Sequence, residues 1–300
     1  MRWSTFARFV AFGASTVLFR RRDPILGTII LTDKCNLRCR HCAVVADAGT
    51  IQPYAGVRAE MEAFYREGLR ILFFCGGETL LWKDGDRTVH DLVREAKEIG
   101  FPLVIVVTNG TISARVPGAD IVFLSIDGMK EAHDAIRGPT FDTIMANLEG
   151  AKGQNTCVYM AINKLNRHDL RPLASLVSAH PALRSISFNF HTPYPGTESL
   201  ALDQAEKKVA VDEIRALMKE GFPVFNLPST LDHFLANDWP RPCAQCIVSE
   251  GGKRWVCGRC IDVPGLCDQC GYLFAAEFGL LFHGNLRAIV DMARVYRSFA

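Results

Sequence analysis

Three cysteines lie close together near the start of this 300-residue chain, in the segment LTDKCNLRCRHC. Cys35, Cys39 and Cys42 fall within eight residues and directly follow the apolar run 25–31. Such a run predicts a buried strand, so the cysteines belong to the loop that leaves its C-terminal end. Three thiolates can hold three irons of a [4Fe–4S] cube, whereas ordinary cube sites use four cysteines. The fourth iron is then open, and an open coordination position is typical of a catalytic metal site.

A partial zinc knuckle, or three unrelated core cysteines, is the alternative interpretation of this segment. A structural zinc site takes four ligands. Neither a fourth thiol nor a pair of histidines lies near the three cysteines in the sequence. The loop position and the lack of further ligands therefore favour the iron–sulfur cluster.

The spacing Cys35-x3-Cys39-x2-Cys42, with His41 just before the last cysteine, resembles the signature of the radical S-adenosylmethionine (SAM) enzymes. The resemblance implies that the open iron binds SAM through its amino and carboxylate groups. It also implies that an electron from the cluster cleaves SAM to a 5′-deoxyadenosyl radical, which takes a hydrogen atom from the substrate.

Composition places the chain among ordinary globular proteins, because 49% of its residues are hydrophobic and 22% are charged. The length allows one large domain, or a large domain with a small one. A net charge of +2, with no basic stripe beyond residues 20–22, gives no case for nucleic-acid binding. The spacing of the first three of the eleven cysteines argues against a disulfide framework, and no credible signal peptide precedes them. We therefore expect a reducing, cytoplasmic compartment.

Residues 1–24 form an apolar stretch that is interrupted by Arg8 and closed by three arginines at 20–22. The stretch is too short and too interrupted for a confident membrane span. We favour an amphipathic helix packed over the bottom of the main domain. The alternative is an interfacial helix that holds the enzyme at a membrane surface, which would suggest a lipid-like substrate.

From residue 25 to residue 226, short apolar runs alternate with amphipathic segments. The predicted strands are 25–31, 70–74, 103–108, 121–126, 156–162 and 185–190. The predicted helices are 54–67, 88–99, 130–150, 170–179 and 204–220. This alternation predicts an α/β fold with a parallel sheet, and six strands fall short of the eight of a closed barrel. We expect a partial (β/α)6 TIM-like barrel with its ligands at the C-terminal ends of the strands, an architecture that the resemblance also implies.

A Gly-Gly-Glu motif, formed by Gly76, Gly77 and Glu78, follows the second predicted strand. Paired glycines allow close approach of the backbone to a ligand, and a carboxylate can hold an ammonium group. The resemblance implies that this motif binds the amino group of SAM, although Thr79 stands where the family often has proline. We interpret Cys75, just before the motif, as a small core residue.

Further polar residues follow the third and fourth strands. Asn109, Ser125 and Asp127 lie at strand ends, where such residues are most often turn formers. The resemblance implies that Ser125 contacts SAM and that Arg137 contacts the SAM carboxylate, for which a guanidinium group is well suited. We count all four among the cofactor-binding candidates.

The loop after the sixth strand carries three candidates for substrate contact or acid–base chemistry, namely His191, Tyr194 and Glu198. A structured, proline-bounded loop with ordinary polar residues is an equally good interpretation. No role follows from the sequence for any of the three.

Six more cysteines lie within 28 residues near the C-terminus, in three CxxC pairs. Each pair can chelate a metal, and the whole set is Cys243, Cys246, Cys257, Cys260, Cys267 and Cys270. Two pairs suffice for a tetrahedral zinc ribbon. The region, 227–300, also resembles the cysteine-rich (SPASM/twitch-like) extensions of maturase-like radical SAM enzymes, which implies an auxiliary [4Fe–4S] cluster, although the spacing departs from their usual seven-cysteine pattern. We favour this second iron–sulfur cluster over zinc, followed by a helical tail at 272–299.

The leading hypothesis is a radical SAM enzyme that acts on a small-molecule or lipid substrate and takes electrons from a donor such as flavodoxin or ferredoxin. A peptide-modifying maturase is the first alternative, but 24 residues before the first strand are too few for a leader-binding domain. The alternative from another class is a non-catalytic iron–sulfur or zinc protein for electron transfer or structure. That alternative leaves the three-thiol loop beside the Gly-Gly-Glu motif unexplained.

Overall fold

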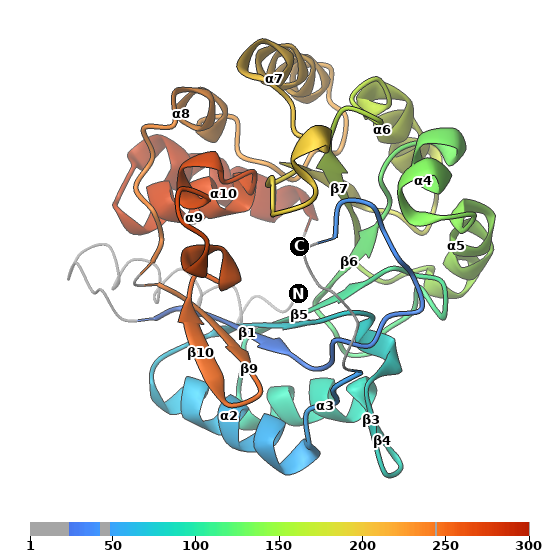
Figure 1. The fold of residues 1–300 in the computed structure, drawn as a ribbon, viewed down its shortest axis with the longest axis vertical. Coiled ribbons are helices and arrows are strands. Elements are labelled where there is room, and N and C mark those ends of the chain that lie inside the picture. The colour runs from blue at the N-terminus through green and yellow to red at the C-terminus, as the bar shows by residue number, and fades with distance from the viewer. Residues whose placement is uncertain (1–23, 43–48, 244, 300) are drawn as a thin grey trace.

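The structure, a computed structural model, describes residues 24–42, 49–243 and 245–299. The predicted helix at 1–24 lies, except for residue 24, outside these residues. An eight-stranded sheet in the order β10-β9-β1-β2-β5-β6-β7-β8 forms the centre of the molecule. Its parallel part consists of β1 (Leu26–Ile30), β2 (Ile71–Cys75), β5 (Leu103–Thr108), β6 (Ile121–Ser125), β7 (Thr156–Ile162) and β8 (Ser185–Phe190). The six predicted strands and the partial barrel are thereby confirmed, and Figure 1 shows the sheet curving round with helices outside it.

The outer helices follow the predicted pattern with one break. They are α2 (Tyr54–Arg66), α3 (Val89–Ile99), α4 (Lys130–Arg137), α5 (Phe141–Asn147), α6 (Leu170–Ala179) and α7 (Gln204–Lys219). The single helix predicted over 130–150 is wrong, because it ends at Gly138, where φ is +87°. Pro139 follows, and proline disfavours a helical residue before it. The Asp134 carboxylate then accepts hydrogen bonds from the backbone N–H of Thr140 and Phe141, both at 3.0 Å, and starts α5.

A hairpin from the cysteine-rich region extends the barrel sheet. Strand β9 (Cys246–Glu250) pairs in parallel with β1, with Cys246 opposite Leu26, and β10 (Lys253–Val256) returns antiparallel to β9. The two-residue turn is Gly251-Gly252, with φ of +57° and +80°. Positive φ at both central residues is the geometry that suits a tight hairpin. The region from residue 227 onward therefore contributes strands as well as cysteines.

Three helices occupy the side where the sheet is open. They are α8 (Thr230–Ala236), α9 (Leu273–Phe282) and α10 (Leu286–Phe299); in Figure 1, α9 and α10 lie between α8 and the β9–β10 hairpin. The predicted tail at 272–299 is broken at His283-Gly284-Asn285, where Gly284 has a φ of +78°. No single described helix is long and apolar enough to span a membrane, and the α9–α10 pair that has such a composition is bent by 119°.

The two faces of the sheet differ in how completely they are covered. On the outer face, Leu72, Phe74 and Val104 are 0% exposed beneath α2 and α3. On the inner face, Phe73 and Tyr159 keep accessible surface and pack around Phe123, with ring centroids 6.1 and 5.3 Å from it. Side chains of neighbouring strand residues point to opposite faces. The barrel interior is therefore aromatic and less tightly closed than the helix-covered side.

Candidate active site

The cysteine loop is held at the C-terminal ends of β1 and β2 by the backbone of the Gly-Gly-Glu motif. Gly77 N–H donates to Thr32 O and Glu78 N–H donates to Lys34 O, both at 2.7 Å. A Cβ atom on Gly76 would lie 2.4 Å from Thr32 O, and one on Gly77 would lie 2.2 Å from Lys34 O. Real Cβ atoms do not approach backbone so closely, so these positions require glycine. The close approach predicted for a ligand is thus made first to the cysteine loop itself.

Glu78 joins the ends of two strands. Its carboxylate is fully buried; Oε1 accepts from Thr108 Oγ1 at 2.6 Å and from Leu80 N at 3.0 Å, while Oε2 accepts from Asn109 N at 2.7 Å. Burial raises the pKa of Glu78, and these hydrogen bonds partly oppose the shift. A carboxylate has about four acceptor positions, so roughly one remains for an ammonium group.

Asn109 links the end of β5 to the cysteine loop. Its Nδ2 donates to Asn36 Oδ1 at 2.9 Å and makes a long contact, 4.0 Å, with Cys35 Sγ. Its Oδ1 accepts from the backbone N–H and the hydroxyl of Thr111, at 2.9 and 2.7 Å. Asn36 in turn donates to Thr111 Oγ1 at 2.7 Å. Sequence reasoning missed Asn36 and Thr111. The partners of Asn36 lie more than 70 positions away, and Thr111 lies in a turn that carries no recognisable motif.

Asp127 and Arg137 form a buried ion pair beside Cys39. Arg137 Nε donates to Asp127 Oδ2 at 2.6 Å, and Arg137 Nη1 lies 3.8 Å from Cys39 Sγ. His41 Nε2 lies 3.5 Å from the same Asp127 oxygen. Ser125, at the end of β6, is buried two residues before Asp127. Two residues that we expected to contact SAM separately are therefore paired with each other.

Burial controls the protonation of the loop. It raises the pKa of the Cys39 thiol to about 11, although the guanidinium group of Arg137 opposes the shift, and it also raises the pKa of Cys35. Burial lowers the pKa of His41 to about 4, so this ring is neutral at neutral pH. Burial is the largest influence on Asp127 and disfavours its charged form, but Arg137, His41 and the hydrogen bond from Ala161 together outweigh it, so the pKa of Asp127 is lowered. Metal binding to these thiols would therefore release protons.

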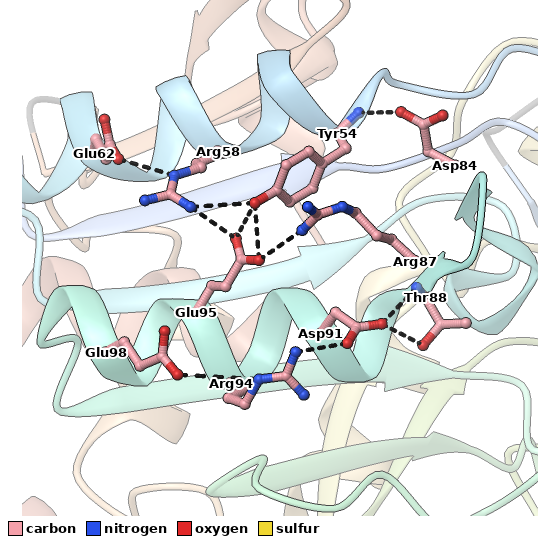
Figure 2. Close-up of polar contacts among 10 residues, drawn as sticks. All are labelled: Tyr54, Arg58, Glu62, Asp84, Arg87, Thr88, Asp91, Arg94, Glu95 and Glu98. Carbon is pink, nitrogen blue, oxygen red and sulfur yellow. Dashed lines mark hydrogen bonds and ion pairs between the residues drawn. The ribbon is translucent and has the colours of Figure 1, made fainter.

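The residues just before α2 are firmly anchored. Gln52 N–H donates to Leu31 O at 2.9 Å, and the buried Trp82 donates its Nε1–H to Gln52 O at 2.8 Å. Figure 2 shows the next contacts: Asp84 accepts from Tyr54 N at 2.7 Å, and the Tyr54 hydroxyl meets Glu95 of α3 at 2.9 Å. The small β3–β4 hairpin (Lys83–Asp84 and Arg87–Thr88), which the sequence did not predict, supplies Asp84 and an arginine partner for Glu95.

The three acid–base candidates after β8 lie in different surroundings. The ring of His191 stands edge-on to that of His41, with centroids 6.3 Å apart, and its Nε2 lies 3.0 Å from Thr197 O. Burial raises the pKa of Tyr194, whose hydroxyl is hydrogen-bonded to Tyr272 and lies near the C-terminal thiols. Glu198 is exposed on the surface. Of the three, only His191 faces the cysteine loop.

The C-terminal cysteines gather around Cys257. This residue follows β10, has a φ of +67° and donates its N–H to Cys246 O at 2.8 Å. Burial raises the pKa of its thiol, and the neighbouring thiols of Cys246, Cys260 and Cys270 add to the effect. Cys260 is hydrogen-bonded to Cys267, and burial raises the pKa of Cys260 to about 12. None of the eleven cysteines is in a disulfide, so both groups are available for metal binding.

The residues of the loop fit an iron–sulfur cluster better than a single ion. Within the parts of the chain that the structure describes, no three His, Cys, Asp or Glu side chains converge as ligands of one metal ion. In a tetrahedral zinc site each thiolate sulfur lies about 2.3 Å from the same ion, so the sulfurs are close together. In a [4Fe–4S] cube each thiolate binds a different iron, so the sulfurs are farther apart. Three thiols outside disulfides, with N–H groups near two of the sulfurs, match the ligand chemistry of a cluster.

Known proteins share this fold and this sequence pattern. Residues 29–177 match the model of the radical SAM superfamily. The chain is 28% identical over 215 residues to the Fe-coproporphyrin III synthase of Methanosarcina barkeri, covering 64% of this chain and 52% of that protein. It is 30% identical over 160 residues to the pre-heme d1 synthase of Dinoroseobacter shibae, covering 49% and 38%. The chain thus spans about half the length, or less, of the curated relatives it matches.

Solved structures agree on the fold. SuiB of Streptococcus suis, bound to the precursor peptide SuiA, superposes with a TM-score of 0.64 at 13% identity, over 89% of this chain and 67% of that chain. The enzyme anSMEcpe with bound AdoMet and a peptide gives a TM-score of 0.59 at 15% identity, over 91% and 84%. Together with the family match and the cysteine loop at the strand ends, these likenesses lead to one conclusion: the chain belongs to the radical SAM superfamily, whose enzymes use a [4Fe–4S] cluster and SAM.

Proposed function

We propose that Cys35, Cys39 and Cys42 hold the [4Fe–4S] cluster and that the enzyme acts on a small organic molecule. The observation that carries the first part is the position of the three thiols, in one loop pinned by Glu78 and Asn109 to the ends of β2 and β5. When bound, the cluster supplies the electron that cleaves SAM, and the resulting 5′-deoxyadenosyl radical abstracts hydrogen from the substrate.

The chain's own residues would orient SAM at the same strand ends. Glu78 keeps one acceptor position for the amino group. Ser125 lies at the end of the next strand but one, buried at the top of the inner face. The inner wall beneath these residues is apolar, so water would be largely excluded from the reacting groups.

The inner face supports a substrate with an apolar, ring-shaped body. Phe73, Phe123 and Tyr159 line it from the strands, and Tyr272 and Phe274 add a second aromatic pair with centroids 5.3 Å apart. Aromatic faces of this kind bind flat apolar molecules through stacking and burial. The names of the two curated relatives, both tetrapyrrole synthases, support the same chemistry, so we propose a tetrapyrrole carboxylate as the substrate class. A peptide substrate remains the alternative, suggested by the peptide bound in SuiB.

The decisive experiment measures 5′-deoxyadenosine after anaerobic incubation of the reconstituted enzyme with SAM and dithionite. We expect cleavage by the wild type and only the enzyme-free background for Cys35→Ala, Cys39→Ala and Cys42→Ala. Cys157→Ala is the matched control, since Cys157 is a buried cysteine of β7 outside the loop. Cleavage retained in any of the three loop variants would overturn the cluster assignment.

The substrate class has its own test in the same assay. Fe-coproporphyrin III, the product named for one of the two relatives, serves as the probe: it should bind to the enzyme, seen as a shift of its visible absorption band, and change the rate of 5′-deoxyadenosine formation. If the probe has no effect while uncoupled SAM cleavage continues, the tetrapyrrole proposal fails and the cluster assignment stands.

We further propose a second iron–sulfur cluster among the six C-terminal cysteines. Four of the other five thiols, those of Cys243, Cys246, Cys260 and Cys270, lie near enough to Cys257 to raise its pKa, and four thiolates are the ligand set of an ordinary cube. An external one-electron donor such as flavodoxin or ferredoxin would reduce the enzyme. Iron, sulfide and zinc analysis separates the cluster from zinc, because a zinc ribbon would give about one zinc and no additional iron.

A further inference from the structure

Arg137 makes a contact that its expected role at the SAM carboxylate does not require. Its Nη1 lies 3.8 Å from Cys39 Sγ, while its Nε donates to Asp127 Oδ2 at 2.6 Å. The Arg137 side chain is 10% exposed and that of Asp127 is 0% exposed. The guanidinium group therefore bridges a buried carboxylate and a thiol, inside the protein rather than in solvent.

The carboxylate that orients Arg137 is itself firmly placed. Asp127 Oδ1 accepts from Ala161 N at 2.8 Å, and its own N–H donates to His133 Nδ1 at 3.1 Å. Asn166 Nδ2 donates to the Asp127 carbonyl at 3.1 Å. Three segments thus hold Asp127, one at its carboxylate and two at its backbone, so the direction of the guanidinium group is set before any ligand binds.

The loop is attached to the same helix end. Arg40 N–H donates to Ile136 O, next to Arg137, at 2.9 Å. Cys39 and the C-terminal turn of α4 therefore keep their relative position. Cys35 and Cys39 differ in the kind of N–H group near the sulfur: Cys35 has the neutral donors Leu37 N and Asn109, whereas Cys39 has a cation.

We propose that Arg137 is a positioning and redox-tuning residue that directs a charged N–H group at the sulfur of Cys39. This inference rests on the proposed function, in which Cys39 is a cluster ligand. Reduction adds negative charge to the cluster and its thiolates, and a nearby cation and an N–H···S contact stabilise that charge. Hydrogen bonds to sulfur and local net charge are known determinants of cluster potentials. Arg137 therefore raises the reduction potential, and Asp127 fixes its direction.

The test is a redox titration of the reconstituted cluster, followed by electron paramagnetic resonance. Arg137→Gln should move the midpoint potential to a more negative value; a tenfold loss in stabilisation of the reduced form corresponds to 59 mV for one electron. The midpoint potential of Arg137→Lys, which keeps the charge, should lie between those of Arg137→Gln and the wild type. The double variant Asp127→Asn/Arg137→Gln removes the cation without leaving a buried unpaired carboxylate, and it should also be more negative than the wild type. Arg171→Gln is the matched control, because Arg171 pairs with Glu213 and Glu220 on the outer helices.

An unchanged midpoint in both glutamine-containing variants would overturn the proposal. If the same variants lost affinity for SAM instead, Arg137 would serve the SAM carboxylate, as the family resemblance implies. A different result would show that Cys39 is not a cluster ligand. Cys39→Ala would then keep its full iron content, and the signal in the redox titration would come from a cluster bound by other cysteines.

Discussion

The two groups of cysteines in this protein are built in different ways. The loop of Cys35, Cys39 and Cys42 is a short continuous segment, and its neighbours include a buried ion pair and two amides. The C-terminal group is assembled from a hairpin and two short 3-10 turns, and its neighbours are other thiols and the phenols of Tyr194 and Tyr272. The first arrangement provides charge and hydrogen bonds near sulfur, which suits a site that must control an electron. The second provides burial and a high density of thiols, which suits tight retention of metal.

The cysteine loop and Cys246, one member of the C-terminal group, lie at opposite ends of β1. Cys246 pairs with Leu26 at the start of the strand, whereas Cys35 follows its end. Four residues of parallel strand, at about 3.3 Å each, place roughly 13 Å of sheet between these levels. The comparison therefore predicts two metal centres that can be removed independently.

The largest expected effect comes from removing one group at a time. The triple variant Cys35→Ala/Cys39→Ala/Cys42→Ala should lose about four of about eight irons and all SAM cleavage. Cys257→Ala/Cys260→Ala should lose the other metal and keep uncoupled SAM cleavage, because the loop is held by the ends of β1, β2 and β5. Metal and sulfide analysis per chain after anaerobic purification provides the measurement. Loss of all iron in both variants would show that the centres are coupled and would break the comparison.

Sequence reasoning was effective where chemistry is local. The six parallel strands were predictable because their outward residues, such as Leu72 and Phe74, are apolar and fully buried. The cysteine loop was identifiable because its three thiols are neighbours in sequence. The β9–β10 hairpin was missed because its exposed residues hide the alternation of a strand, although Gly251-Gly252 was a usable turn signal.

Long-range polar partners were beyond prediction. Arg137 and Cys39 are separated by 98 positions, and their contact depends on where α4 ends against the loop. Glu78 was expected at a ligand, but two of its hydrogen bonds, from Thr108 and Asn109, join β2 to β5. In both cases a residue type suited to binding SAM is equally suited to fastening the site. Only the geometry distinguishes these uses.

A medium effect is expected from a buried carboxyl group on the C-terminal side. Glu277 of α9 accepts hydrogen bonds from Asn226 Nδ2 and Leu227 N, both at 3.0 Å, and lies near Cys157 and Tyr159. Burial raises the pKa of Glu277 from 4.5 to about 7. Between these values the folded chain binds more protons than the unfolded chain, so the free energy of unfolding falls as pH rises through this window.

Glu277→Gln tests this pH dependence, because glutamine keeps an acceptor oxygen and stays neutral. Between pH 5 and pH 8, the unfolding free energy of the wild type should fall by on the order of 3 kcal/mol more than that of the variant. Denaturant titrations of both proteins at the two pH values, with a thiol reductant present, give the comparison. Parallel pH profiles for the two proteins would show that Glu277 does not titrate in this range. The substitution should not affect the cysteine loop, so SAM cleavage by the variant at pH 8 should match that of the wild type.

The smallest expected effect lies in the anchor behind the cysteine loop. Glu95 is largely buried between Tyr54 and Arg87, whereas Arg94, one residue earlier on α3, pairs with Asp91 in solvent (Figure 2). Glu95→Ala removes a buried acceptor and leaves the Tyr54 hydroxyl without an acceptor for its proton, although Arg58 still donates to its oxygen, which should cost about 1–3 kcal/mol of unfolding free energy. Arg94→Ala breaks an exposed pair and should change it by less than about 1 kcal/mol. Thermal and denaturant unfolding of the two variants would measure the difference. If Glu95→Ala also reduced iron retention by the cysteine loop while Arg94→Ala did not, the contacts at the start of α2 would support the cluster site. Equal effects of both variants would show that these contacts are ordinary surface packing.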